Sequence, residues 1–129
     1  MQFDFKYDTS KRGLHTLLKD YENEALKVMW VLPDKQFSSR EVWEAVNVRL
    51  GDKKTISRAS IINFLQYLAE ARILEINSIT GKGGHRGLYK QKYTETEFKK
   101  LVAEILIERL QKNFPGETRE ALEKVIGAN

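Results

Sequence analysis

The sequence contains no cysteine, and this absence excludes several kinds of protein. A disulfide scaffold, a zinc site with Cys ligands and a Cys nucleophile all need the missing residue. The absence also fits a cytoplasmic protein, because disulfides are rare in that compartment. The two histidines, His15 and His85, lie far apart in the sequence and have no carboxylate motif nearby. We therefore expect no metal site and no cofactor.

Long apolar stretches and catalytic motifs are missing as well. No apolar run approaches the ~20 residues that a helix needs to span a bilayer, so no membrane partner is expected. The segment "MQFDFKYDTSKRG" at residues 1–13 is too polar for a signal peptide. No H-x-x-x-H, G-x-S-x-G or dinucleotide-binding pattern occurs. The chain is therefore not expected to be an enzyme.

Basic residues are abundant and unevenly distributed. The net charge of the 129 residues is +4. Residues 35–92 contain eleven Lys or Arg and five Asp or Glu, whereas the segments before and after them each carry a net charge of −1. A localised basic region favours a polyanionic partner such as a nucleic acid. Chance unevenness among solvated charges is the alternative. The order of the secondary-structure elements is needed to choose between these two explanations.

Apolar residues recur at helical spacing in five segments of the chain. Asp20 and Ser57 can each cap the helix that follows, and Ser38 and Glu41 have the spacing of a capping box. Before the first helix, residues 3–8 alternate between aromatic and charged types, which indicates a short strand, with an unstructured tail as the alternative. The predicted helices span residues 21–32, 39–50, 57–71, 95–113 and 117–126.

Four glycines and three lysines fall within "ITGKGGHRGLYKQKY", residues 79–93. A phosphate-binding loop of the Walker type needs G-x-x-x-x-G-K-[ST], but here Lys82 is followed by Gly83, and a strand follows where a helix would be needed. Two extended segments joined by glycines predict a β-hairpin, with a mobile loop without function as the alternative. The predicted strands span residues 73–79 and 86–94. The predicted wing at their tip spans residues 79–88.

The order helix, helix, helix, hairpin, long helix is typical of a winged helix-turn-helix protein. We therefore predict a mainly α fold with a small β-hairpin, consisting of a winged-helix domain and additional C-terminal helices. Residues 1–19 would form an N-terminal extension, residues 20–94 the winged-helix DNA-binding domain and residues 95–129 a C-terminal helical dimerisation region.

The third predicted helix, residues 57–71, occupies the position of the helix that enters the major groove of DNA. The face opposite its apolar stripe is short-chained and mostly uncharged, and Asn pairs well with adenine while small apolar groups contact the thymine methyl. The predicted base-reading residues are Ala59, Ile62, Asn63 and Gln66. The predicted contacts with the DNA backbone, from the starts of two helices and from the wing, are Ser38, Ser39, Arg40, Ser57, Arg58, Ser60, Lys82, His85 and Arg86.

The helix at residues 95–113 carries a broad apolar stripe. Three helices and a hairpin already close a winged-helix core, so a further stripe of this size indicates an interface. Packing of the stripe onto the chain's own helices is the alternative. The residues predicted to form a homodimer interface are Phe98, Leu101, Val102, Ile105, Leu106 and Leu110.

The segments "ENEALKVMW", "SSREVWEAV", "SRASIINFLQYLAEARILE" and "GLYKQKYTETEF" together resemble the penicillinase-repressor (BlaI/MecI/CopY) family of winged-helix repressors, over about residues 18–126. The resemblance implies a homodimer, joined through its last two helices, on a palindromic operator in double-stranded DNA. A protease cuts antibiotic-sensing members at an Asn-Phe bond, and Asn113-Phe114 has these residue types, although Asn is also a common helix terminator. Copper-sensing members carry a C-terminal cysteine cluster, which is missing here.

These observations favour a dimeric, sequence-specific DNA-binding regulator that represses transcription by occupying an operator. A winged-helix module that binds another protein is the alternative, since the predicted groove helix has few basic residues. Salt dependence would separate the two, because phosphate contacts release counterions.

Overall fold

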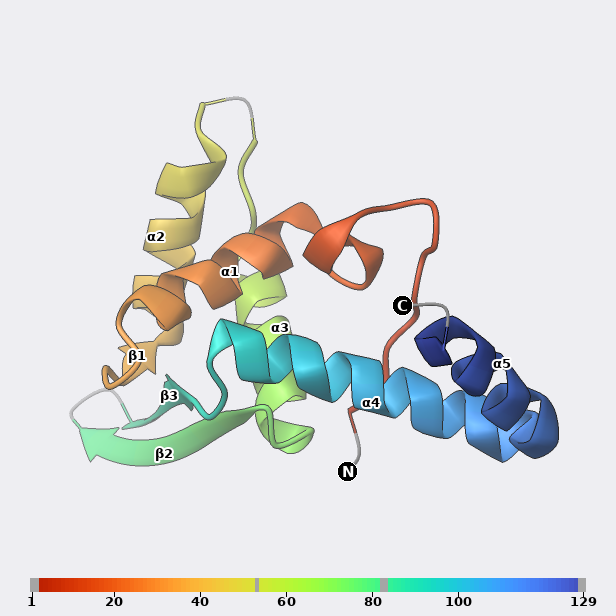
Figure 1. The fold of residues 1–129 in the computed structure, drawn as a ribbon. Helices are drawn as coiled ribbons and strands as arrows, with labels where there is room; N and C mark the ends of the chain where they lie inside the picture. Colours follow the sequence, from red (N-terminus) through yellow and green to blue (C-terminus); the bar gives the residue numbers. More distant parts are fainter. Residues whose placement is uncertain (1–2, 53, 82–83, 128–129) are drawn as a thin grey trace. The chain divides into compact units, whose positions relative to one another are not determined.

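The computed structural model describes residues 3–52, 54–81 and 84–127, with the backbone alone described at 79–81 and 84–86 (Figure 1). The chain divides into two compact units, which we call unit 1, residues 1–94, and unit 2, residues 95–129. The division falls where the predicted C-terminal helical region begins. No helix in the described part of the chain is long and apolar enough to cross a membrane.

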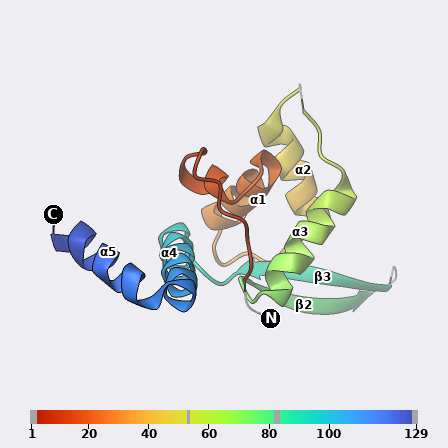
Figure 2. The same ribbon diagram turned by 90° about the vertical axis from the view of Figure 1, so that its right-hand side faces the viewer.

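The described residues of unit 1 form three α-helices, a short 3-10 helix and an antiparallel sheet with the strand order β1-β3-β2. Figure 2 shows α3 along one side of this unit, with the β2–β3 hairpin running beneath it. This is the winged-helix architecture that the order of elements predicted. The elements are η1 (Gly13–Thr16), α1 (Asp20–Val31), β1 (Phe37–Ser38), α2 (Ser39–Leu50), α3 (Arg58–Glu70), β2 (Leu74–Gly81) and β3 (Gly84–Gln91).

The hairpin differs from its prediction in the position of its strands. The register runs from Leu74 opposite Gln91 to Gly81 opposite Gly84. Both strands therefore extend closer to the tip of the hairpin than predicted. Most of the glycine-rich stretch therefore has strand backbone. β1, which was not predicted, places Phe37 opposite Tyr89, and both side chains are buried. A strand of two residues is too short to show the alternation that identifies strands in a sequence.

Capping residues explain where the helices begin. The Ser38 hydroxyl accepts a hydrogen bond from the Glu41 N–H at 3.1 Å, and the Ser38 N–H donates to Glu41 Oε1 at 3.0 Å, which confirms the capping box. Helix α1 lies within one residue of its predicted bounds, but the predicted N-cap was wrong. Its N-cap is Lys19, whose N–H donates to Glu22 Oε1 at 2.7 Å, and Asp20 is the first helical residue. The Asp20 carboxylate is therefore available for other partners.

The core of unit 1 lies between its three helices and the sheet. Its fully buried side chains share the helical spacing that the sequence predicted, and each contributes roughly 1.5–3 kcal/mol by leaving water. At the end of β3, the indole Trp30 Nε1–H donates to the Tyr93 carbonyl at 3.1 Å, which fixes the chain beside α1. The largest fully buried side chains of the unit are Leu26, Met29, Val42, Val46, Ile61, Leu65 and Leu68.

The N-terminal extension packs on the helices of unit 1 without forming the predicted strand. Phe3 is buried, and its ring centroid lies 6.1 Å from that of Tyr67 on α3. The Tyr67 hydroxyl also donates a hydrogen bond to the Asp4 carbonyl. Phe3 thus supplies packing surface for α3, whereas 46% of Tyr7 is exposed.

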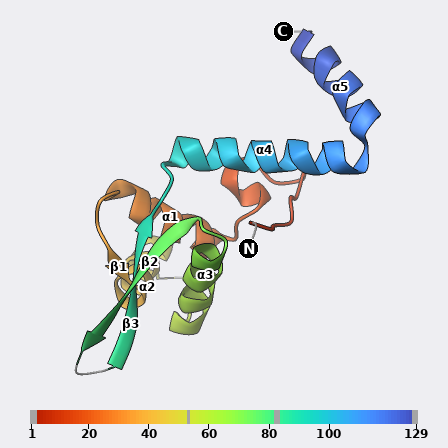
Figure 3. The ribbon, with the colours of Figure 1, turned by 90° about the horizontal axis from the view of Figure 1, so that it is seen from below.

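Unit 2 consists of α4 (Glu95–Asn113) and α5 (Pro115–Gly127). The bounds of α4 agree with the prediction, whereas α5 begins two residues earlier than expected, because proline is well tolerated in the first turn of a helix. Figure 3 shows that the two helices meet at a sharp bend, which lies at Phe114 between them.

Candidate nucleic-acid interface

The two faces of α3 differ in burial as the sequence predicted. Ile61, Phe64, Leu65 and Leu68 are buried in the core of unit 1. On the opposite side of the helix, three of the predicted base-reading side chains are exposed and the fourth is half-buried. The exposed side chains are those of Ala59, Asn63 and Gln66, and the half-buried one is that of Ile62. The structure therefore brings the four residues together on one accessible helix face.

The start of α3 is suited to an anion. The Ser57 hydroxyl accepts a hydrogen bond from the Ser60 N–H at 3.1 Å and lies 2.9 Å from the Ser60 hydroxyl, so Ser57 acts as the N-cap. Arg58 is exposed at the first helical position. The first turn contains no acidic residue, so the positive end of the helix dipole is not neutralised there. Phosphate groups bind favourably at such helix ends.

Two side chains of α2 hold the chain immediately before α3. The indole Trp43 Nε1–H donates to the Ile56 carbonyl at 2.8 Å. Asn47 accepts from the Ile56 N–H at 2.9 Å, and its amide donates to the Ile56 carbonyl at 3.4 Å. These bonds fix the entry of the candidate recognition helix. Sequence reasoning missed both side chains, although Trp43 and Asn47 are spaced four residues apart and so share one side of α2.

The start of α2 contains the other predicted backbone contacts. Ser38 caps the helix, Ser39 is half-buried, and the exposed Arg40 is 2.9 Å from Glu44. The side chain of Lys35 and the Ser38 N–H bind Glu41 and hold the pKa of its carboxyl below the usual value. Arg40 would have to leave or share Glu44 to bind a phosphate group.

The wing is only partly described. Lys82 lies outside the described residues. The backbone of His85 pairs with Thr80 and that of Arg86 with Ile79, but their side chains lie outside the description. The predicted phosphate contacts of the wing therefore stay predictions. At Gly87, a Cβ would lie 3.0 Å from Ile76 Cδ1, so this position leaves little room for a side chain.

Unit 2 contains the predicted dimer residues in three different environments. Phe98, Val102 and Ile105 are buried, Leu101 and Leu106 are half-buried, and 49% of Leu110 is exposed. Leu110 belongs to a groove of about 280 Å³ between α4 and α5. Phe114 and Val125, with exposed fractions of 56% and 62%, also line it. Neither of these two residues was among the predicted dimer residues, because the groove exists only where the two helices meet.

Comparison with known proteins supports the fold. No family model matches the sequence, and no curated protein matches it. A similar solved structure is described as a possible transcriptional regulator from Methanosarcina mazei Go1. The two chains share 15% sequence identity with a TM-score of 0.58, over 80% of this chain and 78% of that chain. At this identity the likeness shows a shared fold, and the resemblance to penicillinase repressors stays a prediction from the sequence.

Proposed function

We propose that the chain is a dimeric, sequence-specific DNA-binding protein that represses transcription by occupying an operator. The observation that carries the proposal is the accessible face of α3, where Ala59, Asn63 and Gln66 project from a helix whose other face is buried in the core. In the helix-turn-helix geometry this face would meet base edges in the major groove. The fold shared with the protein described as a possible transcriptional regulator from Methanosarcina mazei Go1 agrees with this proposal.

The proposed contacts have different tasks. Asn63 would form hydrogen bonds with a base, since its amide matches the donor and acceptor pattern of adenine. Arg58 and the first-turn N–H groups of α3 would bind phosphate, together with the cations of the wing. Phosphate contacts position the protein and carry no sequence information of their own.

Dimerisation is proposed to occur through the apolar groove of unit 2. Leu110, Phe114 and Val125 leave large apolar surfaces exposed around it. A second copy could bury the same residues in a two-fold symmetric arrangement, which is the commonest way in which soluble proteins dimerise. A dimer would place two copies of α3 on half-sites about one or two helical turns of DNA apart.

The first test is the selection of bound duplexes from a random pool at ~0.15 M salt, where non-specific binding is weak. We expect an enriched palindrome whose half-site spacing reports the dimer geometry. Enrichment of a single, non-repeated site would argue against the dimer. No enrichment would remove the proposed function.

The Asn63→Ala variant tests base reading. It should relax the preference at one position of each half-site by about 1–3 kcal/mol, because a side-chain amide with two bonds to the base is lost. Glu70→Ala, at the exposed C-terminal end of the same helix, is the matched control and should keep the preference. An unchanged preference in the Asn63 variant would exclude this residue from base reading.

A winged-helix module that binds protein is the second candidate, and one observation favours it. A surface hollow of about 590 Å³ between α1 and α2 includes the exposed side chains of Val31, Leu32 and Val48. Exposed apolar clusters of this kind mark interaction sites. This candidate predicts no enrichment of any duplex and no steep dependence on salt.

A further inference from the structure

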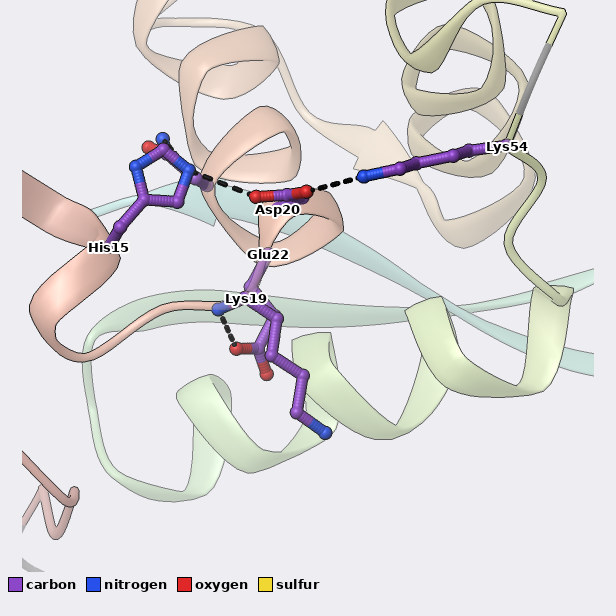
Figure 4. Close-up of polar contacts among 6 residues, drawn as sticks. His15, Lys19, Asp20, Glu22 and Lys54 are labelled. Carbon is purple, nitrogen blue, oxygen red and sulfur yellow. Dashed lines mark hydrogen bonds and ion pairs between the residues drawn. The ribbon is translucent and has the colours of Figure 1, made fainter. Parts of the chain in front are cut away.

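An aspartate of α1 holds a lysine that lies just before the candidate recognition helix. Lys54 Nζ is 2.8 Å from Asp20 Oδ2, and on the other side His15 Nε2 is 3.1 Å from Asp20 Oδ1. Figure 4 shows Asp20 between the other two side chains, which come from the N-terminal extension and from the turn between α2 and α3. The two side chains contact different oxygens, so the carboxylate binds both at once.

The position of Lys54 gives this pair a consequence for DNA binding. Lys54 stands three residues before Ser57, the N-cap of α3, and recognition helices present their N-terminal residues to the groove. The chain immediately before the helix therefore passes close to the phosphates that flank the reading site. A lysine is an effective phosphate ligand because its ammonium group is a mobile point charge.

The Asp20–Lys54 pair is exposed, so it can exchange. The exposed fractions of the two side chains are 56% and 63%. Lys54 also holds the pKa of Asp20 below its usual value, so the aspartate is charged at neutral pH. An exposed pair breaks at little cost when a polyanion offers another partner. His15 would still contact the carboxylate after Lys54 has left, so Asp20 keeps one partner.

We propose that Lys54 is a phosphate ligand, and that Asp20 competes with DNA for it and lowers the affinity of the protein for DNA. The proposal rests on the proposed function and adds a contact that the sequence did not predict. It makes α1 a regulator of affinity, because removal of one acidic group on α1 would release a cation for DNA.

The test uses the full chain and a labelled random-sequence duplex of about 30 base pairs, with Kd measured from low to moderate salt. Lys54→Ala should weaken binding and reduce the slope of log Kd against log salt by about 0.9, the value for one lost phosphate contact. Asp20→Asn should tighten binding by about twofold to fivefold, which is the range for loss of an exposed ion pair.

The double variant and a charge control make the test specific. Asp34→Asn removes the same charge at an exposed position of unit 1 and reports the general electrostatic effect. Asp20→Asn should exceed this control when Lys54 is present and should equal it in the Lys54→Ala background. Such non-additivity is the signature of two groups that interact directly.

Three results would overturn the proposal. Equal effects of Asp20→Asn and Asp34→Asn would show that Asp20 does not compete for Lys54. Weaker binding of Asp20→Asn would show that the aspartate positions the lysine for DNA. An unchanged salt slope for Lys54→Ala would show that Lys54 does not bind phosphate. Failure of the unaltered protein to bind any duplex would instead remove the proposed function, and this inference with it.

Discussion

Unit 1 and unit 2 differ in where their large apolar side chains lie. Unit 1 closes a core around α1, α2 and α3, in which Met29, Val46 and Leu65 are completely buried. Unit 2 has two helices and exposes Leu110, Phe114 and Val125 around a groove. A helix pair cannot enclose a core, so its apolar surface has to be covered by something else. Phe98, Val102 and Ile105 of unit 2 are buried, but the exposed apolar residues around its groove indicate an interface.

The two units also differ in net charge. Unit 1 contains sixteen Lys or Arg and eleven Asp or Glu, whereas unit 2 contains six and seven. The positive charge therefore belongs to the unit with the candidate recognition helix, and unit 2 is nearly neutral. Neutrality is favourable for contact between two identical copies, because like charges would repel. In the proposed function, unit 1 therefore binds DNA and unit 2 forms the dimer.

The largest expected difference concerns stability. Leu65→Ala should lower the free energy of unfolding of unit 1 by about 2–5 kcal/mol, because it leaves a cavity in a closed core. Leu110→Ala should change it by less than about 0.5 kcal/mol, since the side chain is half-exposed in the other unit. Urea unfolding followed by the fluorescence of Trp30 and Trp43, both in unit 1, measures the two effects. Equal losses would show that the two units unfold together.

One added charge tests the assembly role that we propose for unit 2. Leu110→Glu should weaken dimerisation by about 10- to 100-fold, because a carboxylate would be buried in an apolar interface. Sedimentation over a range of concentrations measures this, and affinity for a two-half-site duplex should fall with it. Lys112→Gln changes the net charge equally at an exposed position and should have little effect. A dimer that survives in the Leu110 variant would place the interface elsewhere.

The sequence predicted the helices, the hairpin and the exposed face of α3, because each depends on local periodicity or on a capping residue such as Ser38. It did not predict contacts between residues distant in sequence. The bonds of Trp43 and Asn47 to Ile56, the short strand β1 and the link from Asp20 to Lys54 all depend on how elements pack. Asp20 shows the limit clearly, since its residue type suits a cap and yet Lys19 has that position.

A further prediction separates positioning of α3 from assembly. Asn47→Ala leaves the half-buried Ile56 N–H without its acceptor, which should lower the stability of unit 1 by about 1–3 kcal/mol. Because the entry to α3 is then less fixed, discrimination between operator and random duplex should fall while the dimer stays intact. Gln111→Ala, in unit 2, is the control and should alter neither quantity. Loss of stability with unchanged discrimination would limit Asn47 to a structural role.

The smallest predicted effect concerns the backbone at the end of α3. Arg72 has a φ of 63°, and the hydrogen bonds from Arg72 N–H to the Ala69 carbonyl and from Ile73 N–H to the Leu68 carbonyl form a helix end that favours glycine. Arg72→Gly removes the strain on Cβ but increases the freedom of the unfolded chain, so a net gain of about 0.5 kcal/mol is expected. Arg72→Ala keeps the strain and should show no gain in urea unfolding. A gain as large in the Ala variant would mean that the Arg side chain, and not the backbone conformation, is unfavourable there. Because the position lies in unit 1, neither change should affect the dimer, and a shift in its Kd would mean that the two units are energetically coupled.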